Sequence, residues 1–218
     1  MKKIRFPFAA LTLGLALLAV SLQGCVEMAV MGAGAAALSA FDRRSTGAQV
    51  DDEGIELRAT NRISERFGDR VHFNVTSYNR SVLVTGEVPN EQAKAEIEKI
   101  ISSTVNVRSV TNDLQVAGGT SLSARASDAT ITGKVKARFL DASRFNPLLV
   151  KVVTEASVVY LMGIVTESEA NEAVEVARTT GGVRKVVKVF EYCKPTDAIC
   201  APRGTSAKPE EPKKKSGS

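Results

Sequence analysis

The chain has 218 residues, of which 44% are hydrophobic, 24% charged and 5% aromatic. This composition can bury a core, so it excludes a wholly disordered chain and a multi-span membrane protein. The formal net charge of +5 belongs to the two ends: three basic residues lie in residues 1–24, residues 194–218 contribute +3, and residues 26–193 sum to −1. The charge therefore predicts no nucleic-acid partner.

The N-terminus is typical of a cleaved leader. A cationic start is followed by the apolar run Ala9–Val20, which is too short to cross a ~30 Å hydrocarbon core comfortably. The next residues, Leu22-Gln23-Gly24-Cys25, resemble a bacterial lipobox. We predict a lipoprotein signal peptide over residues 1–24 and acylation of Cys25; the alternative is a leader cut elsewhere, with Cys25 a free thiol.

The residue after Cys25 indicates in which membrane the predicted lipoprotein is retained. Val26 is not the Asp that retains lipoproteins in the inner membrane of Gram-negative bacteria, so we expect the periplasmic face of the outer membrane. Multiple acyl chains on Cys25 would make a persistent anchor. Residues 25–51 include the small-residue stretch Ala29–Ala40, which we interpret as a tether rather than a second membrane segment because Gly and Ala bury little apolar area.

An internal repeat organises the rest of the chain. The strand-like run Val82–Val88 is matched by Val159–Val165, with Gly86 and Gly163 separated by 77 residues. Flanking segments match at a separation of 76, which one inserted residue near Asn146-Pro147 reconciles. We predict two modules, over residues 52–118 and 127–192, joined by a linker at 119–126. Glycine inside a strand pattern marks a bulge or a close backbone approach, so we expect Gly86 and Gly163 to be structural.

Each module shows the same changes of hydrophobic period. The first predicts a helix over 52–67, strands around 71–75 and 82–88, a helix from about 90 to 101, and a strand over 105–116. The second predicts a helix over 128–142, strands over 149–154 and 158–165, a helix over 167–180, and a strand over 183–192. The fold class is therefore α+β, two tandem αββαβ modules, each a three-stranded sheet covered by two helices.

These repeats resemble the BON-domain family. Both carry an apolar strand ending in Gly-x-Val and a later Val-x-x-Val strand, at Val107–Val110 and Val183–Val186. Together with the leader and lipobox, they resemble dual-BON outer-membrane lipoproteins over roughly residues 1–192. The resemblance implies binding of anionic phospholipid, such as phosphatidylglycerol or cardiolipin, through the first helix of the second module.

The residues of that helix can be tested for this role independently. Ile131, Val135 and Phe139 make its core stripe, whereas Leu140 lies on the opposite side beside Lys136 and Gly133. An exposed Leu beside a Lys is typical of an interfacial helix. The alternative is an ordinary solvated face with one exposed Leu. The predicted phospholipid-binding residues are Gly133, Lys134, Lys136, Arg138 and Leu140.

No catalytic site, cofactor or metal site is predicted. His72 is the only histidine, and we expect an ordinary strand residue. No nucleotide-binding glycine loop is evident. Cys193 and Cys200 follow the last strand; in an oxidising periplasm we favour a disulfide over free thiols, with metal binding a third possibility.

The remaining tail, residues 201–218, is rich in Pro, Lys, Ser and Glu and is typical of a disordered segment. Its Lys213–Lys215 run is either solubilising or a contact for lipid or wall polymer. The leading hypothesis is a non-enzymatic outer-membrane lipoprotein that binds anionic phospholipid and supports envelope integrity and stress tolerance. The division site is a further candidate location. The alternative is an adaptor that docks on envelope proteins or peptidoglycan, with membrane contact only through Cys25.

Overall fold

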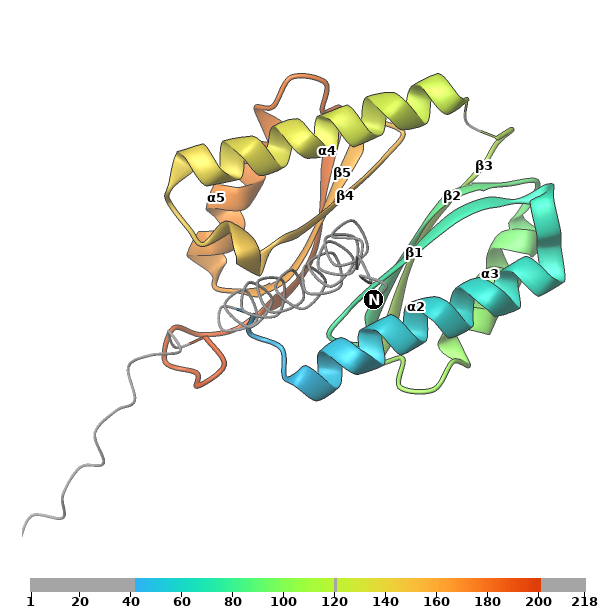
Figure 1. Cartoon of the computed structure of the whole chain (residues 1–218), viewed down its shortest axis with the longest axis horizontal. Helices are drawn as coiled ribbons and strands as arrows, with labels where there is room; N and C mark the ends of the chain where they lie inside the picture. Colours follow the sequence, from blue (N-terminus) through green and yellow to red (C-terminus); the bar gives the residue numbers. More distant parts are fainter. Residues whose placement is uncertain (1–41, 120, 201–218) are drawn as a thin grey trace, which may run out of the picture. The chain divides into compact units, whose positions relative to one another are not determined.

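The computed structural model describes residues 42–119 and 121–200, which form two successive modules with one element order (Figure 1). The first contains α2 (Thr46–Phe67), the short 3-10 helix η1 (Gly68–Arg70), β1 (His72–Tyr78), β2 (Ser81–Val88), α3 (Glu91–Ser102) and β3 (Ser109–Val116). The second contains α4 (Leu122–Ala142), η2 (Pro147–Leu149), β4 (Lys151–Glu155), β5 (Val158–Val165), α5 (Glu167–Arg178) and β6 (Lys185–Tyr192).

Each module has a three-stranded sheet, in the orders β1-β2-β3 and β4-β5-β6. The first two strands form an antiparallel hairpin, and the third pairs parallel to the middle strand. A parallel pair needs a crossover, which α3 and α5 supply. The two helices of each module cover one face of its sheet (Figure 1), so the predicted α+β class is confirmed.

The helix-covered faces hold two separate hydrophobic cores. In the first, α2 and α3 contribute isoleucines that pack on alternate residues of β2, namely Ile55, Ile63, Ile97, Ile101, Val82, Val84 and Val88. In the second, the equivalent positions are Ile131, Phe139, Ala173, Ala177, Val159, Leu161 and Val165. The same four-residue and two-residue spacings predicted the helices and strands from sequence.

Several element boundaries differ from the sequence predictions. Both long helices begin six residues early, at Thr46 and Leu122, because Ser45 and Ser121 act as N-caps that accept hydrogen bonds from Ala48 N and Ala124 N. The helices therefore extend into the predicted tether and linker. The last strands begin later than predicted, at Ser109 and Lys185, and β4 begins at Lys151, after the η2 turn.

The second faces of the two sheets are also covered. Tyr78 and Leu83 of the first module form one buried cluster with Tyr160, Met162 and Ile164 of the second. The Tyr160 hydroxyl donates to Asp113 Oδ2 at 2.8 Å, and Lys151 Nζ donates to Glu56 Oε1 at 3.0 Å, so polar contacts also join the modules. Sequence analysis predicts sheets covered on one face only; the contact between the modules explains why every residue of β2 after Ser81 is buried.

Within residues 42–119 and 121–200, no helix is both long and apolar enough to span a membrane.

Candidate membrane-binding surface

The candidate surface is built on α4, whose buried side is fixed by the second core. Ile131, Val135 and Phe139 are 4%, 0% and 1% exposed, as the sequence periodicity predicts. Phe139 also packs edge-to-face against Phe145, with ring centroids 5.0 Å apart. These contacts lock the rotation of the helix, so its opposite side is presented to solvent.

The opposite side of α4 carries an exposed stripe. Leu122 is 80% exposed and Leu140 is 66% exposed. They are separated by 18 residues, or five helical turns and about 27 Å, so they lie on the same line along the helix. We define the α4 stripe as these two leucines and the exposed residues between them on that line, namely Leu122, Ala126, Ala129, Gly133, Lys136 and Leu140.

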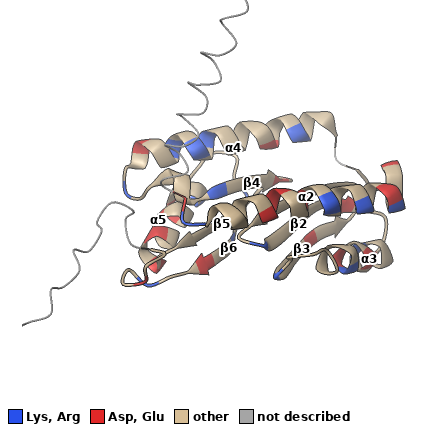
Figure 2. Ribbon diagram, turned by 60° about the horizontal axis from the view of Figure 1, so that its bottom comes forward, with Lys and Arg blue, Asp and Glu red and all other residues tan. Residues whose placement is uncertain are grey.

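The charge of α4 distinguishes it from α2 and α5. It contains four basic and two acidic residues, whereas α2 contains three basic and five acidic, and α5 one basic and four acidic. Of the two acids on α4, Asp128 is buried and Asp141 lies outside the stripe. Figure 2 shows the basic residues spread along the helix. The α4 stripe therefore has no acidic residue to repel an anionic headgroup.

A groove of about 420 Å³ lies beside the C-terminal end of the stripe. Lys136, Leu140 and Leu148 line one part of it, and Arg44 and Tyr78 line another. Leu148 is 47% exposed, so a second large apolar side chain accompanies Leu140. The Arg44 guanidinium stacks on the Tyr78 ring at 4.2 Å. Burial, together with the Asp42 carboxylate, raises the pKa of Tyr78 from its ordinary value of 10.0 to about 12.

The structure distributes the predicted lipid-binding residues over two roles. Gly133, Lys134, Lys136 and Leu140 are exposed. Arg138 is half-buried, and its Nη1 donates to Val176 O at 2.9 Å and to Thr180 Oγ1 at 2.9 Å. These bonds hold the carbonyl end of α5, as a cation at a helix C-terminus does. We therefore exclude Arg138 from the surface and assign it to packing between α4 and α5.

Sequence reasoning missed Leu122 and Leu148. Leu122 lies in the predicted linker, and the serine N-cap at Ser121 is the signal that could have extended the helix to include it. Leu148 lies in the segment between α4 and β4, where η2 leaves it exposed while Leu149 is buried. No local pattern distinguishes these two adjacent leucines. Cys25 lies outside the described residues.

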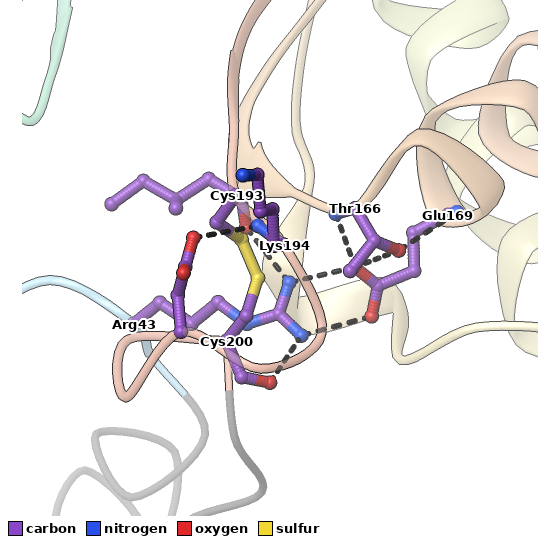
Figure 3. Close-up of a disulfide and its surroundings, with 8 residues drawn as sticks. Arg43, Thr166, Glu169, Cys193, Lys194 and Cys200 are labelled. Atoms are coloured by element: carbon purple, nitrogen blue, oxygen red, sulfur yellow. Dashed lines mark hydrogen bonds and ion pairs between the residues drawn. A yellow bond between two sulfur atoms is a disulfide. The ribbon is translucent and has the colours of Figure 1, made fainter.

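The segment before α2 is tied to the second module. Arg43 donates to Glu169 Oε2 at 2.7 Å and Oε1 at 3.0 Å, to Ile164 O at 2.9 Å and to Cys200 O at 3.2 Å (Figure 3). Cys200 is joined to Cys193 in the predicted disulfide, with Cα atoms 6.1 Å apart. The disulfide therefore holds in place one of the carbonyl groups that accepts from Arg43.

Glu169 links this contact to the start of α5. Its carboxylate accepts from Thr166 N at 2.7 Å while Thr166 Oγ1 accepts from Glu169 N, which is a capping box. Burial acts to raise its pKa, but the Arg43 guanidinium and the Thr166 hydrogen bonds outweigh this, so the pKa of Glu169 is lowered. The carboxylate is thus held charged between a helix N-terminus and an arginine.

Comparison with known proteins defines the class. The BON domain family model matches residues 51–118 and 127–194, which contain both αββαβ modules except the first five residues of α2 and of α4. The chain therefore belongs to the BON-domain family and carries two BON domains.

The similarity to two known proteins extends over more than a single BON domain. The chain is 36% identical to the outer membrane lipoprotein DolP of Haemophilus influenzae over 175 aligned residues. The aligned region covers 79% of this chain and 91% of that protein. It is also 33% identical over 153 residues to a protein named 21 kDa hemolysin from Actinobacillus pleuropneumoniae, covering 69% of this chain and 79% of the relative.

Proposed function

We propose that the chain is an outer-membrane lipoprotein whose second BON domain binds anionic phospholipid and thereby supports the integrity of the envelope. The observation that carries this proposal is the α4 stripe, which combines two exposed leucines, one lysine and no acidic residue. The likeness to the outer membrane lipoprotein DolP supports the location. Apolar insertion and cationic attraction are the two forces by which a helix attaches to a bilayer surface.

The α4 surface is compatible with a lipid anchor at Cys25. The described chain starts at Asp42, which lines the same groove as Lys136 and Leu140. Cys25 lies 17 positions before Asp42, and a segment of this length reaches at most ~60 Å. The predicted anchor and the α4 stripe could therefore contact one bilayer together, so that acyl chains supply affinity and α4 supplies preference for anionic headgroups.

Vesicle co-sedimentation tests this proposal. The fragment Asp42–Ser218 suits the assay because it contains both cores and all contacts described above, and lacks the predicted anchor. We expect it to bind phosphatidylglycerol or cardiolipin vesicles, to bind phosphatidylcholine vesicles weakly, and to dissociate as salt rises. Lys136→Glu with Leu140→Glu should weaken binding about tenfold or more, since each basic residue at the surface contributes ~1 kcal/mol.

A matched control comes from the first module. Leu57 on α2 is 63% exposed, almost as much as Leu140, but α2 carries more acidic than basic residues. Leu57→Glu should therefore leave vesicle binding unchanged. Equal binding by the Lys136→Glu/Leu140→Glu variant and the unaltered fragment would exclude the α4 stripe. Absence of vesicle binding, with recovery of one stoichiometric envelope protein or of peptidoglycan, would favour the adaptor function instead.

A further inference from the structure

Three metal-ligating side chains meet where the two modules contact each other. His72 begins β1, Glu87 lies directly opposite it on β2, and Glu155 ends β4 of the second module. Their ligand atoms all lie within 4.8 Å of one another. His72 Nδ1 is 2.8 Å from Glu87 Oε2, and Glu155 Oε2 accepts a hydrogen bond from Thr85 Oγ1 at 3.3 Å.

The cluster is largely withdrawn from water. The side chain of Glu87 is 7% exposed and that of His72 24%, and Glu155 is 8% exposed. Two carboxylates brought this close in a poorly solvated site repel each other unless a proton or a cation lies nearby.

The cluster is reachable from two sides. His72 and Glu87 line a cavity of about 780 Å³, and His72 and Glu155 line another of about 440 Å³. A hydrated ion can therefore approach without separating the modules. Arg125 lines both cavities, and its positive charge repels a cation bound there.

The ionisable pair His72 and Glu87 is not a general requirement of the fold. At the repeat separation of 77 residues, His72 and Glu87 correspond to Leu149 and Ile164 in the second module, and both of these are apolar and buried. The second module thus builds the same hairpin without an ionisable pair. The polar cluster in the first module is a property of this sequence at the contact between the modules.

We propose that His72, Glu87 and Glu155 bind one Zn²⁺ ion that bridges the two BON domains. One imidazole and two carboxylates form a donor set of the kind that zinc accepts, with water completing a tetrahedral shell. Imidazole favours zinc over calcium and magnesium, which prefer oxygen ligands and higher coordination. Two ligand atoms on one tetrahedral zinc lie about 3.4 Å apart, so small side-chain rotations suffice. Sequence analysis predicts no metal site because Glu155 is 83 residues from His72 and in the other module.

Isothermal titration of the fragment Asp42–Ser218 with Zn²⁺, after chelator treatment and without a histidine tag, tests this site. The fragment contains one histidine and no free thiol, since Cys193 and Cys200 are paired. We expect one ion per chain, and at least about tenfold weaker binding for Glu155→Gln and for Glu87→Gln. Glu65→Gln, at an exposed glutamate of α2, is the matched control and should bind as the unaltered fragment does.

Two further readouts keep the proposal testable if a variant folds poorly. Zn²⁺ should shift the ring resonances of the single histidine in the unaltered fragment, and it should raise the melting temperature, because the ion binds the native state. Ca²⁺ and Mg²⁺ should do neither. Binding of equal strength in Glu155→Gln, unmoved His72 resonances, or no saturable 1:1 binding would each overturn the bridging site.

Discussion

Asp52 and Asp128 occupy equivalent positions in the two modules and perform the same task. Asp52 is 2% exposed and accepts from Asn79 N at 2.7 Å and Arg80 N at 2.6 Å. Asp128 accepts from Ala156 N at 2.9 Å and Ser157 N at 2.8 Å. A carboxylate that receives two backbone N–H groups makes charge-assisted hydrogen bonds, which are stronger than neutral ones.

These bonds explain two hairpin turns that lack glycine. Asn79 and Arg80 have φ values of 52° and 66°, and Ala156 and Ser157 have 49° and 62°. Two successive left-handed residues are typical of a type I′ turn, for which Asn-Gly is the usual sequence. The buried aspartate offsets the cost of placing Ala or Ser there. The local sequence pattern does not predict the buried role of Asp52, because its hydrogen-bond partners lie outside α2.

Glu169 gives a residue-scale prediction about pH. Glu169→Gln keeps an oxygen for the capping box but removes the ion pair with Arg43, so it should cost about 1–2 kcal/mol of unfolding free energy near neutral pH. The pKa of Glu169 is lowered in the folded state from its ordinary value of 4.5. The stabilisation is therefore present above about pH 4.5 and is lost as pH falls through the lower folded value.

Urea unfolding of both proteins at pH about 7 and about 3 measures this effect. Glu167→Gln is the control, since Glu167 is exposed in the same first turn of α5. A difference between wild type and Glu169→Gln that stays constant across this range would contradict the ion-pair explanation.

At the scale of elements, the glycines at the centre of each sheet are confirmed as close backbone approaches. A Cβ on Gly163 would lie 2.3 Å from Leu149 O, and one on Gly86 would lie 2.1 Å from His72 O. Gly86 also has a φ of 125°, which side-chain-bearing residues rarely adopt. The middle strand therefore lies closer to β1 in the first module, and to η2 in the second, than a residue with a side chain would allow.

Gly163→Ala and Gly133→Ala should change stability in opposite directions. At Gly163 the added methyl meets a backbone oxygen, and we expect a loss of about 1–3 kcal/mol. Gly133 is exposed on α4, with nothing within 4 Å of an added Cβ, so alanine should stabilise the helix by up to about 1 kcal/mol. Chemical denaturation of both variants decides the matter; a neutral Gly163→Ala would show that the sheet can move apart at no cost.

At the scale of the whole described unit, the two BON domains share an apolar interface. Leu83 is fully buried against residues that include Tyr160 and Met162 of the second domain. The domains also share the Tyr160 to Asp113 and Lys151 to Glu56 contacts. Although each domain has its own core, this interface should make their unfolding cooperative.

Leu83→Ala tests that coupling. Truncating a fully buried leucine should cost about 2–5 kcal/mol, and because the loss falls at the interface, a single calorimetric transition should broaden or split. Leu57→Ala, at the exposed leucine of α2, should change stability by less than about 0.5 kcal/mol and keep one transition. Two transitions already present in the unaltered protein would show that the domains unfold independently.

The sequence by itself determined the architecture of each domain. Apolar positions such as Ile55, Ala59 and Ile63 recur every four residues, and Val71, Phe73 and Val75 alternate, because helix and strand faces repeat with these periods. Because of the 76-to-77-residue repeat, the helices and strands predicted for one module could be compared with those predicted for the other. The rotation of α4 followed from the same rule, so the exposure of Leu140 and Lys136 could be predicted.

Only the tertiary structure decided which residues from different elements and from the two domains are in contact. Leu83 is buried by residues of the other domain. Asp52 and Asp128 accept hydrogen bonds from the hairpin turns, and Arg138 donates to the C-terminal end of α5. All these contacts join residues from different elements. So does the meeting of His72, Glu87 and Glu155. Hydrophobic periodicity reports which face of an element is buried, but not what that face meets, because partners distant in sequence leave no mark on the local pattern.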